Sequence, residues 1–358
     1  MHSGFLDHES ASARAPGRLA GKHNAPRLPP DTSVRTRLSG RYARRVDRPT
    51  RTPTRPSTEA WTTRRLLAWM GEAFTKKGLE APRLQSELLL AHVIGCERLR
   101  LYMEADRPAS PLERDQLRDL VSRALAHEPV QYLVGEGWFF SLPFHVDRRV
   151  LIPRPATETI VQHVLQHARV EPGFGGKTGE GVLIADVCTG SGCIAAALAK
   201  NLTGARVVAT DIAADALEIA EKNAQRHGVA ERVDFLRGDL LEPLSQHPVA
   251  RGNGSLHYLV SNPPYIPDHE WDDVAPNVKN YEPSLALRGG KDGLDLVRPL
   301  IEFGPELLRP GGLMLVEVAD STAATALELM KAGPKIEHAE VLEDFEGLPR
   351  VVLGRARR

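Results

Sequence analysis

The sequence VLIADVCTGSGCIA, residues 182–195, decides the fold, because a short apolar run there passes through a glycine turn into a helical pattern. Its segment GSGCIA, residues 190–195, satisfies the G-x-G-x-x-A fingerprint of nucleotide-binding turns. Gly190 and Gly192 permit a tight turn and let a ligand approach bare backbone, while the helix start behind them offers free N–H groups to an anionic group. This strand–turn–helix unit predicts an α/β fold that binds an adenosine-containing cofactor.

The rest of the C-terminal half continues the alternation of strands and helices. Short apolar runs separated by helical patterns occur at VLIADV (182–187), RVVAT (206–210), residues 232–236, HYLVS (257–261) and GLMLVEV (312–318). Such alternation predicts a parallel sheet with helices on both faces. Ligands of open sheets of this kind bind at the carboxyl ends of the strands.

Three carboxylates near these strand ends indicate the kind of cofactor. Asp211 ends the second strand, 21 residues after Gly190, where a carboxylate accepts hydrogen bonds from both ribose hydroxyls. The fingerprint leaves NAD and S-adenosylmethionine open. Asp186 favours S-adenosylmethionine, because it can face that molecule's cationic amino-acid end and would repel a pyrophosphate. Asp239 is placed to meet an adenine amino group, with Leu240 against the ring; the alternative for Asp239 is a helix cap or turn residue.

The strand at 257–261 ends in Asn262-Pro263-Pro264-Tyr265, beside the predicted cofactor site. This motif suits methylation of a planar amide or aryl amine, whose nitrogen is a poor nucleophile because its lone pair is delocalised. The Asn262 side-chain oxygen and the Pro263 carbonyl can each accept one N–H and so favour the tetrahedral geometry of attack. Proline brings no competing N–H, and Tyr265 offers a flat face to a planar group. The alternative interpretation is an Asn-Pro turn that merely leaves the strand.

A separate helical region precedes the α/β part. Helical spacing of apolar residues, a stop at Gly78 and a capping box at Ser110-Pro111-Leu112-Glu113 predict a bundle over residues 59–128, which we interpret as a substrate-docking domain. The expected apolar stripes are Leu67, Met70 and Phe74, then Leu84, Leu88 and Ala91, then Leu117, Leu120, Val121 and Ala124.

The segment between the two parts has a different composition. Residues 129–152 are β-rich, with Gly135 and Gly137 as turn signals, and predict a β-hairpin linker. Pro153-Arg154-Pro155-Ala156-Thr157-Glu158 then opens a helix, and we predict that the cofactor-binding domain spans residues 153–358.

Composition limits the class of protein. The chain has 358 residues, 42% apolar and 26% charged, enough for two globular domains, and it contains no apolar run long enough to cross a membrane. Cys96, Cys188 and Cys193 form no CxxC pair, which excludes a disulfide scaffold, argues against a zinc site and indicates a reducing compartment. We therefore expect a cytoplasmic protein without a bound metal, and we expect a monomer.

Residues 1–58 differ from the rest of the chain. They contain 12 Lys and Arg, 4 acidic residues and seven prolines without apolar periodicity, which predicts a disordered basic leader. The alternatives are an organellar transit peptide, a solvated tail or an over-extended start site. Because the formal net charge is zero, the other 300 residues carry a surplus of eight acidic groups. This surplus argues against a folded part whose main surface binds nucleic-acid phosphates.

Through DVCTGSGCIA (186–195), Asp211 and NPPY (262–265), the sequence resembles the class I S-adenosylmethionine-dependent methyltransferases. More closely, residues 59–358 resemble the HemK/PrmC family of peptide chain release factor N5-glutamine methyltransferases. The resemblance implies a Rossmann-like class I methyltransferase sheet. It also implies methylation of the glutamine in the Gly-Gly-Gln motif of class I release factors. The segments that carry it are EPVQYLVG (128–135), LIPRPATE (151–158), NPPYIP (262–267), YEPSLAL (281–287) and GGKDGLDLVR (289–298).

Positions that match the family's motifs imply roles for individual residues. Asp211 would bind ribose and Leu240 would lie near adenine. Asn262 through Tyr265 would hold the substrate glutamine, with Asn262 also facing the cofactor. The methionine end of S-adenosylmethionine would be wrapped by Cys188, Thr189, Gly190, Ser191 and Gly192.

Two positions depart from the family pattern. Ala156 stands where an acidic residue is usual, which puts an acidic contribution at that hinge in doubt, and Cys188 stands where glycine is frequent. Glutamine methylation of a ribosomal protein is the second hypothesis, disfavoured by the PRP-x-T-E form of residues 153–158. DNA adenine-N6 methylation is the third, disfavoured by the acidic body and the absence of a target-recognition domain. We expect no role at a membrane and no direct role with nucleic acid.

Overall fold

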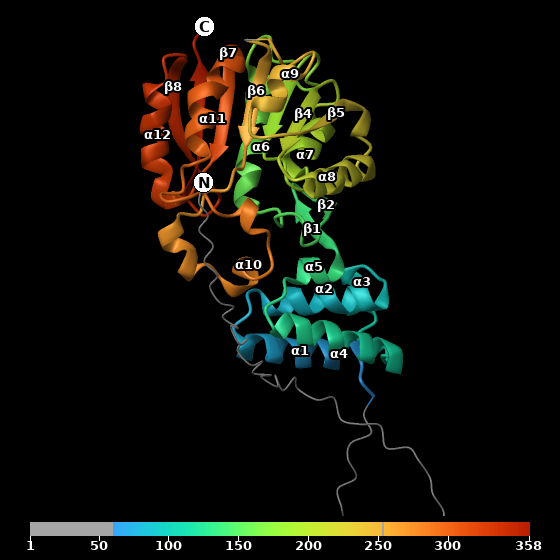
Figure 1. Cartoon of the computed structure of the whole chain (residues 1–358). Helices are drawn as coiled ribbons and strands as arrows, with labels where there is room; N and C mark the ends of the chain where they lie inside the picture. Colours follow the sequence, from blue (N-terminus) through green and yellow to red (C-terminus); the bar gives the residue numbers. More distant parts are fainter. Residues whose placement is uncertain (1–59, 253) are drawn as a thin grey trace, which may run out of the picture. The chain divides into compact units, whose positions relative to one another are not determined.

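A seven-stranded sheet forms the centre of the C-terminal part in the computed structural model, which describes residues 60–252 and 254–358 (Figure 1). The strand order is β5-β4-β3-β6-β7-β9-β8, with β3 and β6 at the middle. The predicted leader, residues 1–58, lies outside the described residues. The strands are β3 (Leu183–Val187), β4 (Arg206–Asp211), β5 (Val233–Arg237), β6 (Leu256–Ser261), β7 (Leu308–Glu317), β8 (Ile336–Glu343) and β9 (Pro349–Ala356).

The predicted parallel arrangement holds for β3 to β7 and is wrong at one edge of the sheet. The strands β8 and β9 were not among the predicted ones, and β9 runs antiparallel to both β7 and β8. Antiparallel neighbours need only a short turn, whereas parallel ones need a long crossover. The short β8–β9 turn is closed by Asp344, whose Oδ1 accepts from the amides of Glu346 and Leu348 at 2.9 and 3.0 Å.

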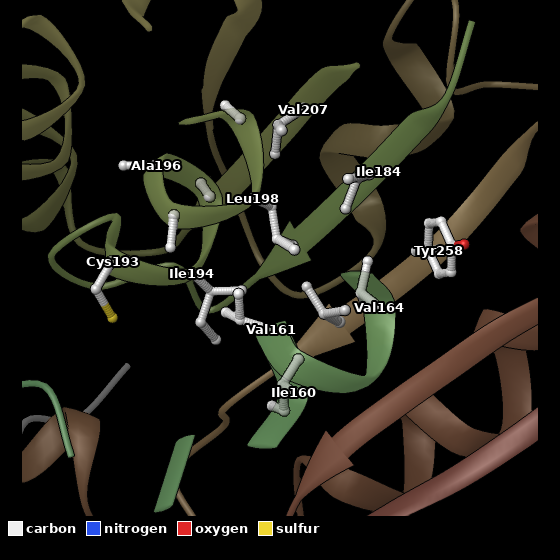
Figure 2. Close-up of a cluster of buried hydrophobic side chains, with 14 of the residues drawn as sticks. Ile160, Val161, Val164, Ile184, Cys193, Ile194, Ala196, Leu198, Val207 and Tyr258 are labelled. Atoms are coloured by element: carbon white, nitrogen blue, oxygen red, sulfur yellow. The ribbon is translucent and has the colours of Figure 1, made fainter. Parts of the chain in front are cut away.

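Helices cover both faces of this sheet, as the alternation of strands and helices predicts (Figure 1). Side chains alternate along a strand, so Ile184 of β3 packs with α6, α7 and α8, while its neighbours Leu183 and Ala185 pack with α11 and α12. Figure 2 shows Val161 and Val164 of α6 gathered near Ile184. The helices are α6 (Glu158–Val170), α7 (Cys193–Asn201), α8 (Ala214–Arg226), α9 (Glu242–Gln246), α10 (Pro276–Lys279), α11 (Val297–Phe303) and α12 (Ala323–Ala332).

The N-terminal region is helical, as predicted, and has a hydrophobic core of its own. Its first helix ends at Gly78 in the left-handed conformation, and the predicted Ser110–Glu113 capping box is present. These two signals act locally, which is why the sequence reveals them. The helices are α1 (Thr63–Lys77), α2 (Pro82–Ile94), α3 (Arg98–Met103), α4 (Pro111–Leu125) and α5 (Val130–Val134).

Two of the predicted apolar stripes are shifted around their helices. In α1, Leu66 is buried with Met70 and Phe74, whereas Leu67 is only half-buried. In α2, Leu84 is 40% exposed, and the buried apolar face is formed by Leu89, Leu90 and Ala91. Glu87 also lies inside that face, because Arg83 and Arg98 pair with its carboxylate at 3.0 and 2.7 Å. A buried carboxylate that is paired with exposed arginines hides the buried face from a search for apolar periodicity.

The predicted β-hairpin exists, but it is shorter than residues 129–152. Val130–Val134 is the helix α5, and the hairpin consists of β1 (Glu136–Phe139) and β2 (Leu142–His145). Gly135 caps α5, and Gly137 is paired with Phe144 inside the hairpin, so neither glycine forms the turn. The turn residues are Phe140 and Ser141, both in the left-handed conformation, and Phe140 N donates to Glu158 Oε1 at 2.7 Å.

The PRPATE segment opens a helix as predicted. Its first turn is a 3-10 helix, Pro155–Thr157, which runs directly into α6. The other 3-10 turns are Ala230–Arg232, Asp268–Asp273, Ser284–Ala286, Gly304–Leu307 and Asp320–Thr322. Among residues 60–252 and 254–358, no helix is both long and apolar enough to span a bilayer.

Candidate active site

The loop between β3 and α7 adopts left-handed backbone conformations at three positions. The φ angles are 60° at Cys188, 55° at Gly190 and 74° at Gly192. Thr189 N donates to the carbonyl of Thr210 at 2.9 Å, which ties the loop to the neighbouring strand β4. The left-handed conformation costs a non-glycine residue about 1–2 kcal/mol. Cys188, in place of the frequent glycine, therefore leaves the loop strained.

The two loop glycines are required for different reasons. A Cβ atom at Gly190 would meet no heavy atom of the described residues within 4 Å, and Gly190 lines the cavity next to the loop. A Cβ atom at Gly192 would lie 2.9 Å from Cβ of Ala220 on α8, and Gly192 does not line that cavity. Close approach of a ligand to bare backbone thus fits Gly190. At Gly192 the expectation is corrected, because the missing side chain makes room for α8.

Asp186 lies beneath the loop, fully buried, and does not line the cavity. Its Oδ2 accepts from Thr189 Oγ1 at 2.7 Å and from Ala195 N, near the start of α7, at 3.0 Å, while Oδ1 has no hydrogen-bond partner within the part of the chain that the structure describes. One of the N–H groups near the helix start, that of Ala195, is therefore already engaged within the protein and not free for an anionic ligand. In its ionised form this carboxyl places negative potential under the loop, which suits a cationic ligand and opposes a pyrophosphate.

We expect Asp186→Asn to remove part of the pH dependence of stability. Burial raises the pKa of Asp186 from 3.8 to about 7, so the native state favours the protonated carboxyl. This contribution is complete below about pH 4 and is lost as the pH rises to about 7, at up to about 1.4 kcal/mol per pH unit. Urea unfolding of both proteins between about pH 4.5 and about pH 7, a window within that range, measures the difference. Parallel stability curves would contradict this prediction.

Asp211 ends β4 at the cavity wall, as predicted. Its Oδ2 accepts from Gly190 N and its Oδ1 from Ala213 N, both at 2.9 Å. Each carboxylate oxygen has a second lone pair, so the group keeps acceptor capacity for ligand hydroxyls. Burial raises the pKa of Asp211, and the backbone N–H donors at Ala213 and Gly190 oppose that rise.

Predicted cofactor residues from four different strand ends meet at one cavity. Asp239 is exposed at its rim, and Leu240 next to it has a φ of 44°. The carbonyl of Asp239 accepts from Glu242 N at 2.9 Å, so its backbone forms a turn while its side chain remains available to a ligand. The predicted site residues that line this cavity are Cys188, Thr189, Gly190, Ser191, Asp211, Asp239, Leu240, Asn262 and Pro264.

A second cavity adjoins the first at the NPPY motif. Asn262 lines both cavities, Tyr265 lines only the second, and Pro263 is buried and lines neither. A contribution of Pro263 to a substrate would thus come from its carbonyl alone. The second cavity is lined by Leu151, Arg154, Asn262, Tyr265, Ile266, Val274, Val278, Ala286 and Leu287.

Two side chains that the sequence analysis did not single out contact the motif. Thr157, from the PRPATE segment, accepts from Asn262 Nδ2 through its hydroxyl at 3.1 Å. Glu317, at the end of β7, is fully buried and accepts from the Tyr265 hydroxyl at 3.0 Å. Glu317 could have been found from the sequence, because it is an acidic residue at the carboxyl end of an apolar strand, as Asp186 is. The contact of Thr157 could not have been predicted, because 105 residues separate it from Asn262 in the sequence.

A buried ion pair joins the PRPATE and YEPSLAL segments. Arg154 hydrogen bonds to Glu282, whose side chain is fully buried. The second oxygen of Glu282 accepts from the amide of Ile152 at 3.0 Å. Two segments that are distant in sequence are thereby fixed at the wall that both cavities share.

The residues present fit S-adenosylmethionine. Asp211 offers acceptors for ribose hydroxyls, Asp239 offers one for an adenine amino group, and Gly190 leaves the backbone open. The buried Asp186 lies below the loop with one oxygen unpartnered among the described residues, and the cationic end of that cofactor would favour its ionised form. The donor set therefore favours S-adenosylmethionine over NAD.

Comparisons with known proteins identify relatives of this chain. Residues 65–135 match the PrmC N-terminal domain family, and residues 184–280 match a methyltransferase domain family. Release factor glutamine methyltransferases of Chlorobaculum tepidum and Geobacter sulfurreducens are each 39% identical to this chain. The alignments cover 82% and 83% of this chain and 97% and 98% of those proteins. A crystal structure of the release factor-specific protein-(glutamine-N5) methyltransferase of Alicyclobacillus acidocaldarius is 25% identical, covers 60% of this chain and 100% of its own, and has a TM-score of 0.35.

The sheet order, the cofactor cavity and the relatives lead to one assignment. The protein is an enzyme with a class I methyltransferase fold, and S-adenosylmethionine is its methyl donor. With more than a third of its residues identical to these relatives over most of both chains, the protein belongs to the release factor glutamine methyltransferase family.

Proposed function

We propose that this enzyme methylates the side-chain amide nitrogen, N5, of the glutamine in the Gly-Gly-Gln motif of class I peptide chain release factors. The observation that carries the proposal is the pair of adjoining cavities that share Asn262. One suits the cofactor, and the other suits a planar side chain that enters from a flexible protein segment. The names of the relatives support a release factor as the substrate.

The residues at the shared wall would act by positioning the acceptor. The Asn262 side-chain oxygen accepts one N–H of the glutamine amide and the Pro263 carbonyl accepts the other, which favours the tetrahedral nitrogen of the transition state. Bound S-adenosylmethionine supplies an electrophilic methyl group on a sulfonium. The nitrogen held by Asn262 and Pro263 would take up that methyl group as the sulfur–carbon bond breaks, and would then release one proton to solvent. Tyr265, at the second cavity, packs against the planar amide.

We also propose roles for the residues at the cofactor cavity. Asp211 holds the ribose hydroxyls, and Asp239 and Leu240 hold the adenine. Asp186 acts through the loop that it supports, since it does not line the cavity. We further propose that the helical residues 59–128 dock the substrate, and that the enzyme works as a monomer in the cytoplasm. The free thiols of Cys96, Cys188 and Cys193 support a reducing compartment.

Mass spectrometry of a purified class I release factor, incubated with this protein and S-adenosylmethionine, tests the proposal. We expect the mass of one methyl group to be added at the glutamine of the Gly-Gly-Gln motif. A release factor with that glutamine replaced by alanine serves as the control and should stay unmodified. An unmodified wild-type release factor, together with a methylated ribosomal protein or DNA in parallel reactions, would overturn the assignment of the substrate.

A further inference from the structure

We propose that Thr157 and Glu317 are positioning residues that determine which end of the Asn262 side-chain amide faces the acceptor. The inference rests on the proposed function, because it concerns the residue that binds the substrate amide. It adds two residues to the reaction that do not themselves touch the reacting atoms. Their effect runs through Asn262 and, for Glu317, through Tyr265 as well.

The first step is the contact between Thr157 and Asn262. Thr157 is 1% exposed, and its hydroxyl accepts from Asn262 Nδ2 at 3.1 Å. An amide has donors at its nitrogen end and acceptors at its oxygen end. With the nitrogen end engaged by Thr157, the oxygen end is the one available to the cavities. This is the end that a substrate N–H needs.

The second step is the direction of the hydrogen bonds. A threonine hydroxyl has one proton, so a hydroxyl that donates to one neighbour must accept from the other. The second neighbour of Thr157 is the Glu317 carboxyl; burial raises the pKa of that carboxyl, and the Thr157 hydroxyl opposes the rise. Asn262 Nδ2 donates to the Thr157 hydroxyl at 3.1 Å, so the hydroxyl accepts on that side and its own proton is left for the side of Glu317.

The third step is the placement of Glu317 itself. It is fully buried at the end of β7; its Oε1 accepts from the Tyr265 hydroxyl at 3.0 Å, and its Oε2 has no hydrogen-bond partner in the described structure. A buried carboxylate with an unpartnered oxygen is costly for stability. Glu317 is therefore close to both polar side chains of the NPPY motif. It accepts directly from Tyr265, and it is linked to Asn262 through Thr157. A role in the reaction explains why a costly carboxylate occupies this position.

Reversal of the Asn262 side-chain amide would remove a hydrogen bond to the acceptor nitrogen. If Thr157 donated to Asn262, the Asn262 NH₂ group would face the NH₂ group of the substrate glutamine, and two donors would meet. The acceptor would lose one of the two hydrogen bonds that hold its nitrogen for attack. We expect the loss to appear in kcat, because that hydrogen bond strengthens as the nitrogen becomes positive.

The experiment compares Thr157→Val with Thr157→Ser in steady-state methylation of the release factor. Valine keeps the volume and removes the hydroxyl, and we expect kcat to fall about tenfold, the effect of one lost net hydrogen bond. The affinity for S-adenosylmethionine and the melting temperature should change little. Serine keeps the hydroxyl and should restore kcat. Thr322→Val is the matched control, because Thr322 is also buried and its hydroxyl donates to the carbonyl of Ala319 at 3.1 Å.

Glu317→Gln tests the direction of the hydrogen bonds. The amide of glutamine can donate to Thr157 and so permits the reversed arrangement, and we again expect kcat to fall about tenfold. In the double variant with Thr157→Val, the two effects should not add, because both act through one chain of hydrogen bonds. Equal kcat values for wild type, Thr157→Val and Glu317→Gln would overturn the proposal. So would a Thr157→Ser variant as slow as Thr157→Val.

Failure of the proposed function gives a different result. In that case wild-type protein leaves the release factor unmethylated, whatever the variants do. The same variants are then compared on the acceptor that wild type does modify, a ribosomal-protein glutamine or a DNA adenine. Each of these acceptors presents N–H groups to Asn262, so the expected order of rates is the same, and equal rates overturn the positioning roles there too.

Discussion

Asn262→Ala is expected to lower kcat for release factor methylation by on the order of 10²–10³-fold, the usual effect of removing one preorganised polar contact to a transition state. The alanine removes the proposed acceptor for one amide N–H and leaves Asp211 and Asp239, which line the cofactor cavity, in place. Binding of S-adenosylmethionine, measured by calorimetry, should therefore remain close to that of wild type. The measurement is a single-turnover rate at saturating cofactor, so that binding and chemistry are separated.

Asn280→Ala provides the control for Asn262→Ala. Asn280 is exposed, follows α10 and lines neither of the two cavities, so that its removal should leave kcat unchanged. A near-normal rate in Asn262→Ala would remove the central part of the proposed mechanism. A loss of cofactor binding equal to the loss of rate would assign Asn262 to the cofactor instead.

Asp211→Ala is expected to weaken S-adenosylmethionine binding by about 1–3 kcal/mol, roughly 5- to 150-fold in Kd. The variant loses the acceptors for the ribose hydroxyls. It also leaves Gly190 N and Ala213 N without the carboxylate that now accepts from each at 2.9 Å. The loop that lines the cavity is then less preorganised. Isothermal titration with S-adenosylmethionine, or with S-adenosylhomocysteine to avoid turnover, measures the effect.

The effect of Asp211→Ala differs from that of Asn262→Ala in one respect. High concentrations of cofactor should restore most of the rate in Asp211→Ala, because the acceptor site is unchanged, whereas no concentration restores Asn262→Ala. Asp215→Ala is the matched control, since Asp215 is an exposed carboxylate in the first turn of α8. An unchanged Kd in Asp211→Ala would show that the carboxylate only supports the loop.

Much of the fold could be predicted because its signals are local. The strand, glycine turn and helix of residues 182–195 lie where predicted, and Gly78 and the Ser110–Glu113 box end and begin their helices as expected. Each signal depends on backbone conformation or on a hydrogen bond within a few residues. The β8–β9 edge escaped prediction, because its strands pair antiparallel outside the strand–helix alternation.

Errors within the predicted elements arose where tertiary contacts choose between similar residues. Leu66 rather than Leu67 enters the core of the helical region, and Gly137 pairs within the hairpin while Phe140 and Ser141 make its turn. Glu158 accepts from the Phe140 amide and so supports that unusual turn from 18 residues away. Composition cannot reveal such support.

The sequence by itself determined the class of fold, the cofactor loop, and the positions of Asp211 and Asn262 at strand ends, because parallel strands bring their carboxyl ends to one edge of the sheet. Only the tertiary structure decided which neighbours each group at that edge contacts. It placed Gly192 against Ala220, Asp186 under the loop, and Thr157 on the amide of Asn262. The physical reason is that close packing and hydrogen-bond direction depend on neighbours that approach from distant parts of the chain, which a linear pattern does not record.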